Sequence, residues 1–440
     1  MDRPMKHSDQ AWLGYLPDDW QVLSARRLFT NRREHAGDAQ QLAVTQKAGV
    51  VPQDEYIKAS GNNLARALKG TESFRRVRQG DFVISLRSFE GGIEFSQFDG
   101  CVSPAYTVLA PVAAADPRFL RHLLKSAPFV SALQSQTDSL RDGKAIGFEQ
   151  LSRVRLPLPR TDEQRAIARF LDYETARIDA LIAKQERLIE LLKEKRQAVI
   201  SHAVTKGLNP DAPVKDSGVE WLGAVPAHWD VLPVKRVVTS VTSGPRGWSE
   251  HIVDDGDAAF IQSGDLGSRG VVEADKANRI NSESSVEAAR ALLQQGDLLV
   301  CITGAKTGNA AVFVGCDRPA YLNQHLARLR PMAEKANAKF LLAVLTSSPG
   351  QAHFTLSQYG LKQGLGLEQI ENVAVAFPPM AEQLDIVAYL DDQESIFERL
   401  VRASDEQVAL LRERRTALIS AAVTGKIDVR NWQPAEEQAA

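Results

Sequence analysis

Two long charged segments contain a regularly spaced series of apolar residues. In residues 161–204 apolar side chains recur at alternating spacings of about three and four residues, and no proline or glycine interrupts them. This spacing predicts a single helix with a narrow apolar stripe. Pro159 and the following Thr161-Asp162-Glu163-Gln164 supply N-cap and capping-box residue types for its start, and Gly207 marks its end.

The same pattern returns 219 positions later, in residues 381–424. Forty residues of α-helix extend over about 60 Å, which is longer than one globule of this size needs. Two such helices with matching stripes are expected to pack as a coiled coil, antiparallel if the duplication has a pseudo-two-fold axis. The alternative is that each helix covers its own globule. The stripe residues are Ile167, Leu171, Ile178, Leu188, Ile386, Leu390, Leu400 and Leu411.

Short apolar runs bounded by turn residues occupy the rest of each half. Asp81–Leu86 follows Gln79-Gly80, and Asp297–Ile302 follows Gln295-Gly296 at an offset of 216. Such runs predict strands, and helical stretches near residues 117–134 and 336–348 complete the pattern. Each half therefore predicts the same α+β globule with different surface loops.

The chain is a tandem duplication. Trp12-Leu13-Gly14 with Pro17 and Trp20 returns 209 positions later as Trp221-Leu222-Gly223 with Pro226 and Trp229. The offset grows from 209 to 216 at the strand and to 219 at the helix, so the difference of 219 − 209 = 10 residues lies inside the globules. The helices kept their length while the globules diverged. We expect globules at 1–158 and 207–376, helices at 159–206 and 377–430, and a tail at 431–440.

Composition and charge narrow the possible classes of protein. A 440-residue chain with 44% hydrophobic and 25% charged residues is typical of soluble multidomain proteins. The sequence shows no signal-like segment and no long apolar stretch, and its three cysteines are widely spaced. We therefore expect a cytoplasmic protein that does not bind a membrane. Lys+Arg minus Asp+Glu is 21 − 17 = +4 for 1–158 and 10 − 8 = +2 for 159–206, but 15 − 18 = −3 for 207–376 and 7 − 12 = −5 for 377–440. DNA binding would therefore require local basic patches or a partner's charge.

Catalytic motifs are missing from the sequence. There is no G-x-x-x-x-G-K-[ST] phosphate loop, no H-E-x-x-H and no C-x-x-C. Phe377-Pro378-Pro379-Met380 lacks the polar and aromatic residues of an adenine methyltransferase motif. Asp142 and Lys144 lack a suitably spaced partner carboxylate and fit a loop better than a nuclease centre. We expect a non-catalytic chain without a metal or cofactor of its own.

Taken together, the repeated opening motif and the two matching helices resemble the specificity subunit of type I restriction–modification systems. The resemblance covers essentially the whole chain. Its motifs are Trp12–Trp20, Trp221–Trp229, 157–204, 377–423, the exits Gly147–Pro159 and Gly366–Pro379, and the loops Ser88–Ile93, Ser103–Tyr106, Thr303–Gly308 and Asn323–His325.

The resemblance implies an α+β fold of two target recognition domains separated by two long helices in an antiparallel coiled coil. Each domain would recognise one half of a bipartite sequence in double-stranded DNA, and the helices would set the spacer between the halves. The stripe residues named above would form subunit interfaces with DNA methyltransferase subunits, two of them expected, and with restriction subunits. S-adenosylmethionine, ATP and Mg²⁺ would be bound by those partners only.

Candidate DNA-binding residues follow from the chemistry of base recognition. Arg and Lys suit guanine, and Asn and Gln suit adenine. The alternative to DNA binding for any single candidate is that it is an ordinary solvated surface residue. For His325 the alternative is a hydrogen-bonded position in a strand. Trp12 and Trp221 fit packing anchors better than base stackers. The candidates are Arg75, Arg76, Arg78, Arg87, Arg141 and Lys144 in the first globule and Arg246, Lys306, Asn323, Gln324, His325, Lys362 and Gln363 in the second.

Two other functions remain open at this point. The acidic second half suits a non-catalytic adaptor whose globules bind protein or carbohydrate ligands. A nuclease would depend on Asp142 and Lys144 alone. The sequence does not specify the target bases or the spacer length.

Overall fold

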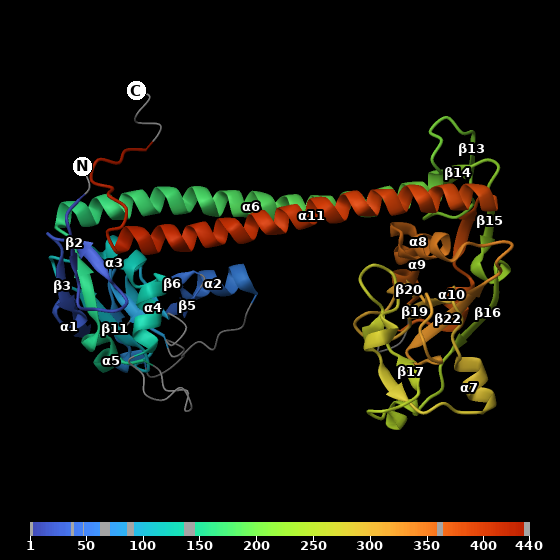
Figure 1. The fold of residues 1–440 in the computed structure, drawn as a ribbon, viewed down its shortest axis with the longest axis horizontal. Coiled ribbons are helices and arrows are strands. Elements are labelled where there is room, and N and C mark those ends of the chain that lie inside the picture. Colours follow the sequence, from blue (N-terminus) through green and yellow to red (C-terminus); the bar gives the residue numbers. More distant parts are fainter. Residues whose placement is uncertain are drawn as a thin grey trace. The chain divides into compact units, whose positions relative to one another are not determined.

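The computed structural model describes residues 3–36, 39–46, 48–61, 71–85, 92–135, 146–358 and 364–434. It divides into two compact units (Figure 1), and each combines one globule with parts of both long helices. Unit 1 contains residues 1–186 and 406–440, and unit 2 contains residues 187–405. No helix in the described part of the chain has an apolar stretch of the length needed to cross a bilayer.

Unit 1 is built on an antiparallel four-stranded sheet in the order β4-β11-β8-β9. Its strands are β4 (Phe29–Arg32), β8 (Phe82–Ile84), β9 (Ile93–Phe95) and β11 (Thr107–Pro111). Apolar side chains from the sheet and the surrounding helices form its core. The remaining elements are β1 (Met5–His7), β2 (Tyr15–Pro17), β3 (Gln21–Ser24), α1 (Ala25–Leu28), β5 (Leu42–Thr45), β6 (Gly49–Pro52), α2 (Gln53–Ser60), η1 (Thr71–Ser73), β7 (Arg75–Val77), β10 (Gly100–Val102), α3 (Pro117–Leu123), α4 (Ala127–Gln134), α5 (Phe148–Arg153) and β12 (Arg155–Leu158).

Unit 2 repeats this sheet as β16-β22-β19-β20 and adds a three-stranded sheet, β18-β17-β21. β17 and β21 are parallel neighbours, so their carboxyl ends lie at one edge. The elements are β13 (Val214–Asp216), β14 (Ala224–Pro226), β15 (Asp230–Pro233), η3 (Val234–Arg236), β16 (Val238–Ser243), η4 (Trp248–His251), β17 (Ala258–Ile261), η5 (Ser263–Asp265), η6 (Ala274–Lys276), β18 (Asn278–Ile280), α7 (Val286–Ala291), β19 (Leu298–Cys301), β20 (Ala310–Val312), β21 (Ala320–Leu322), β22 (Leu326–Pro331), α8 (Ala338–Thr346), α9 (Ser348–Ser357), α10 (Leu367–Glu371) and β23 (Ala374–Phe377).

The two sheets correspond in detail, as the duplication predicted. β8 and β19 lie at the same place in their sheets, and each is preceded by a buried aspartate. Arg32 holds Asp81 at 2.8 Å in unit 1, and Arg330 holds Asp297 at 2.7 Å in unit 2. In both units an arginine thus pairs with the aspartate before the equivalent strand, although it comes from β4 in unit 1 and from β22 in unit 2.

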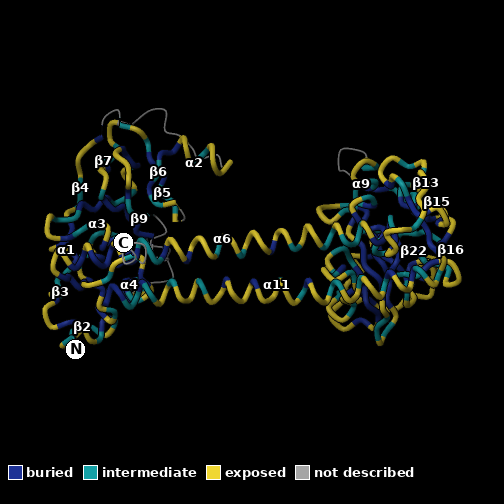
Figure 2. The backbone as a smooth tube through the Cα atoms, turned by 90° about the horizontal axis from the view of Figure 1, so that it is seen from above, coloured by how far each residue is buried: buried dark blue, intermediate teal, exposed yellow. Residues whose placement is uncertain are grey.

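Both long helices form as predicted. α6 runs over Thr161–Lys206 and α11 over Met380–Val423. Within unit 1, Arg415 pairs with Asp179 at 2.8 Å and Arg412 pairs with Glu186 at 2.8 Å. Residue numbers rise along α6 as they fall along α11, so the helices are antiparallel. Figure 2 shows exposed and more buried positions alternating along both helices, as expected of stripes that pack on one side only.

The repeated glutamine at each helix start has a different role from the predicted capping box. Gln164 is 1% exposed, donates to the carbonyl oxygens of Ala114 and Pro159, and accepts from the backbone of Asp116. Gln383 makes the equivalent bonds in unit 2. Each glutamine therefore ties a long helix to its own globule.

Candidate nucleic-acid interface

In unit 2 the carboxyl ends of three strands bring polar side chains to one edge. The backbone N–H of Asn323 after β21 donates to Ile261 of β17 at 3.0 Å. Thr303 follows β19, and its hydroxyl oxygen lies 2.6 Å from the Nδ1 atom of His325. We call this the recognition edge and define it by Gln262, Asn278, Thr303, Lys306, Gln324 and His325.

The predicted Asn-Gln-His motif forms the centre of this edge. Asn323 is buried, and its Oδ1 accepts the backbone N–H of His325 at 2.8 Å, which fixes the turn. His325 is exposed, and its Nε2 lies 3.2 Å from the amide of Gln324. Asn323 therefore has a structural role, whereas Gln324 and His325 are presented at the surface.

Two loops carry predicted cations around the motif. Lys306 is exposed in the loop between Gly304 and Gly308, and it forms no ion pair with any residue that the structure describes. Burial raises the pKa of Asp265, and the nearby Lys306 ammonium opposes that shift. Arg246 is exposed in the loop after β16, which is held beside the motif by a 3.3 Å bond from Gly244 to Asn323. The edge thus combines amides, an imidazole and the Lys306 ammonium, with Arg246 on the neighbouring loop.

The predicted arginines of unit 1 are used differently. Arg78 pairs with Glu34 at 3.0 Å, and Arg76 donates to the carbonyl oxygen of Ala36 at 3.3 Å. Arg75 is half-buried on β7, opposite Val102 of β10. Arg76 and Arg78 are therefore bonded within unit 1, and these three arginines do not form a cluster like that of unit 2.

The turn corresponding to Asn323–His325 also differs in unit 1. β10 continues into Ser103-Pro104-Ala105 where β21 continues into the Asn-Gln-His motif. This turn offers one hydroxyl in place of the Gln324 amide and the His325 imidazole, so the two globules present different chemistry on a shared frame.

Several predicted residues lie outside the described ranges: Arg87, Arg141, Lys144, Lys362 and Gln363. The described chain resumes at Gly364, which forms a β-bridge with Thr303 of the recognition edge. Sequence reasoning missed Gln262, Asn278 and Thr303. The sequence did contain a signal that could have identified Gln262, because this residue directly follows the apolar run of β17.

Most of the helix stripe packs inside its own unit. Ile167 and Leu171 lie in the core of unit 1 and Ile386 in that of unit 2, each at most 1% exposed. Ile178 is also buried, while Leu390 and Leu411 are half-buried. Leu188 and Leu400 are 43% and 46% exposed. The first turns of α6 and α11 therefore cover their own globules. Among the eight stripe residues, only Leu188 and Leu400 are classed as exposed.

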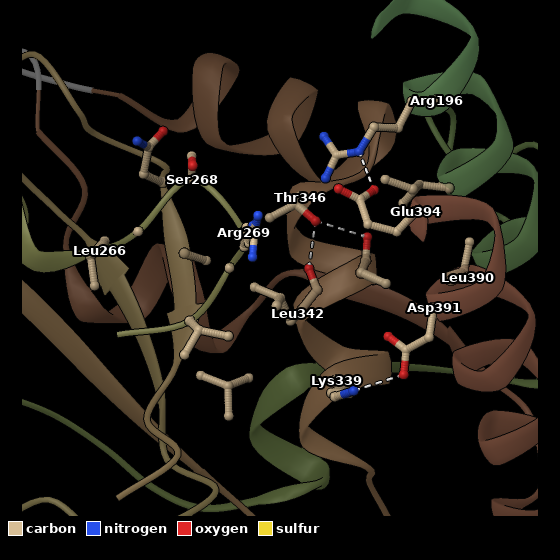
Figure 3. Close-up of a pocket in the computed structure, with 18 of the residues that line it drawn as sticks. Arg196, Leu266, Ser268, Arg269, Lys339, Leu342, Thr346, Leu390, Asp391 and Glu394 are labelled. Atoms are coloured by element: carbon tan, nitrogen blue, oxygen red, sulfur yellow. Dashed lines mark hydrogen bonds and ion pairs between the residues drawn. The ribbon is translucent and has the colours of Figure 1, made fainter. Parts of the chain in front are cut away.

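A cavity of about 520 Å³ lies within unit 2, where α8 and the loop 266–271 meet the long helices (Figure 3). Three acidic residues of α11 form ion pairs around it. Asp391 pairs with Lys339 of α8 at 2.7 Å, Glu394 with Arg196 of α6, and Glu398 with Arg269 at 2.9 Å. Arg269 belongs to the loop that begins at Gln262, so its ion pair with Glu398 connects that loop to α11.

Comparisons with known proteins agree with this architecture. The model of the type I restriction modification DNA specificity domain matches residues 226–408. The EcoBI specificity subunit of Escherichia coli is 25% identical over 320 residues, covering 70% of this chain and 65% of that protein, just under two thirds of its length. The StySPI specificity subunit of Salmonella potsdam is 20% identical over 439 residues, 97% of this chain and 86% of that one.

Solved structures share the fold. A chain from a study of complex assembly and conformational transition of the type I R-M system has a TM-score of 0.72 at 19% identity, covering 94% of this chain and 99% of that one. The HsdS subunit from Thermoanaerobacter tengcongensis has a TM-score of 0.54 at 18% identity, covering 94% and 98%. The likeness extends over both units and both helices.

Proposed function

The chain belongs to the type I restriction–modification specificity subunits, and from this premise we propose that each unit recognises one half of a bipartite DNA sequence. The observation that carries the proposal is the recognition edge of unit 2. It presents half-buried Gln324 and exposed His325, two side chains suited to base reading, on a turn fixed by buried Asn323. Amides and imidazoles held at rigid strand ends suit direct readout in the major groove.

Two recognition units on one chain make specificity additive. Each mismatched base pair costs about 1–3 kcal/mol, and costs at well-separated positions add. The different turns after β10 and β21 support different half-sites for the two units.

As a specificity subunit the chain is a non-catalytic component, and we propose that its partners supply the chemistry. Exposed Leu188 and Leu400 would contribute to docking of two methyltransferase subunits, with restriction subunits joining the same complex. S-adenosylmethionine, ATP and Mg²⁺ would be held by those partners, and the methyltransferase would flip its target adenine out of the stack. A target in cellular DNA implies a cytoplasmic site of action.

The test is adenine methylation across a genome after co-expression of this chain with the methyltransferase of its system. We expect a split motif with an unread gap. Replacing residues 20–150 with those of a relative should change one half of the motif and leave the other. Absence of any motif, or a motif indifferent to the exchange, would exclude the proposal in favour of an adaptor.

The cations at the edge lead to a prediction about salt. Each phosphate contact contributes about −0.9 to the slope of log K against log salt concentration. Lys306→Ala should therefore reduce the magnitude of the slope by about one and weaken binding to all duplexes alike. Fluorescence anisotropy of the complex at several salt concentrations measures this. Lys335→Ala is the control, because exposed Lys335 follows the opposite end of β22; equal slopes for both variants would remove Lys306 from the interface.

A further inference from the structure

We infer that Gln262 and Asn278 act as one unit that recognises an adenine in the half-site of unit 2. The inference rests on the proposed function and adds to it the identity of a base and of its readers.

The two amides come from neighbouring antiparallel strands. Gln262 directly follows β17, and Asn278 begins β18, opposite Phe260. The Asn278 Nδ2 donates to the Gln262 Oε1 at 3.0 Å. Within the described ranges neither side chain has a second hydrogen-bond partner. One nitrogen and one oxygen of the pair are therefore left to face a ligand.

This remaining donor and acceptor match the major-groove edge of adenine. Adenine presents the N7 acceptor beside the N6 amino donor, whereas guanine presents two acceptors, N7 and O6. Against guanine the free carbonyl oxygen of the pair would face another acceptor. Thymine offers only an acceptor and a methyl group, and cytosine only a donor. The match does not depend on which amide donates, because exchanging both amide orientations again leaves one donor and one acceptor.

The backbone holds the pair in place before any DNA binds. Asp265 accepts the Gln262 N–H through its Oδ2 at 2.7 Å, and its own N–H donates to the Gln262 carbonyl oxygen at 3.0 Å. Ile261, directly before Gln262, is fully buried. A side chain anchored at its backbone and at its own amide loses little entropy on binding, which favours selective recognition.

The bond between Gln262 and Asn278 contributes little to the stability of unit 2. Gln262 is half-buried and Asn278 is exposed, so both can exchange their mutual bond for water at small cost. We therefore expect their replacement to change base preference and leave folding intact.

The experiment uses the complex of the full chain with its methyltransferase and begins with the motif that the complex methylates. Affinities are then measured for the matching duplex and for duplexes substituted at each base pair in turn. For the wild-type complex, a substitution at the adenine of this half-site should weaken binding roughly tenfold or more. For Gln262→Ala and for Asn278→Ala the ratio at that one position should fall to about one, with all other ratios kept.

Two further variants sharpen the result. In Gln262→Glu the Asn278 amide still donates to residue 262, and the two groups left over are both acceptor oxygens, so the preference at that position should move from adenine to cytosine. Gln295→Ala replaces an exposed glutamine before the opposite end of β19 and should leave every ratio unchanged. The melting temperature of each variant is measured as well. If Gln262→Ala proves to be unfolded, the result for Asn278→Ala decides the question.

The inference is overturned if the ratios stay at wild-type values, if the two alanine variants relax different positions, or if the relaxed position is not A·T. Failure of the proposed function looks different, because the wild-type complex would then show no bipartite motif at all.

Discussion

Replacing Arg3 with alanine is expected to lower the free energy of unfolding of unit 1 by roughly 3–5 kcal/mol, the cost of leaving a buried charge without its partner. The Arg3 guanidinium donates to both carboxylate oxygens of Glu163 and, at 2.7 Å, to Asp19. The side chains of Arg3 and Glu163 are only 8% and 5% exposed. Hydrogen bonding to Glu163 raises the pKa of Arg3, so the guanidinium stays charged throughout the accessible pH range.

The effect is large because no other described side chain donates a hydrogen bond to the Glu163 carboxylate. The equivalent carboxylate in unit 2, Glu382, accepts from Trp229 Nε1 at 3.1 Å and lies 2.8 Å from His228 Nε2. In unit 1 the corresponding indole, that of Trp20, is buried and its Nε1 has no hydrogen-bond partner among the described residues. Among the described residues, Arg3 is therefore the one that forms an ion pair with Glu163, and Arg430 adds only a longer-range attraction.

Urea unfolding followed by circular dichroism measures the effect. Arg165→Ala is the control on the same helix, since its side chain is 62% exposed and its ion pair with Asp116 spans 3.6 Å; we expect a change within about 0.5 kcal/mol. Adding Glu163→Gln to Arg3→Ala should restore part of the loss by removing the unpaired charge. A loss below about 1 kcal/mol for Arg3→Ala would contradict the argument.

The long helices and the duplication could be predicted because their signals are local and periodic. A stripe of apolar residues at helical spacing is sufficient to predict α6, whose observed end at Lys206 differs from the predicted one by two residues. The strands β8 and β19 follow from short apolar runs after Gln-Gly turns in the same way. Trp12 and Trp221 were expected to be packing anchors, and each ring packs against another aromatic residue, Phe129 and His353 respectively.

What escaped prediction depends on contacts between distant segments. The capping-box pattern at Gln164 is local, but its amide bonds instead to loops that only the tertiary fold brings near. The pairing of Gln262 with Asn278 requires knowing that β17 and β18 are antiparallel neighbours, and the segment around Asn278 has no apolar alternation to indicate it. The sequence likewise does not indicate that Arg76 of β7 donates to the carbonyl oxygen of Ala36, or that Arg78 just after β7 pairs with Glu34.

The second large effect is expected at Gly244, where substitution by alanine should disrupt the recognition edge of unit 2. A Cβ atom there would lie 2.0 Å from the carbonyl oxygen of Leu322 and 2.6 Å from that of Asn323. Both contacts are with backbone at the end of buried β21, so no side chain can rotate away. Relief requires the loop after β16 to separate from the Asn-Gln-His turn, at a cost of roughly 1–3 kcal/mol or more.

The expected result is a lower melting temperature of unit 2 and a loss of at least tenfold in affinity for the specific duplex, because a shift of the turn misplaces Gln324 and His325. Gly264→Ala is the matched control. It lies in the loop after Gln262, its φ is outside the left-handed region, and an added Cβ would meet nothing within 4 Å. In Gly244→Ala, the ratios of affinity between the matching duplex and duplexes substituted in the half-site of unit 1 should keep their wild-type values. If Gly244→Ala and Gly264→Ala behave alike, the close approach of the two loops does not organise the recognition edge.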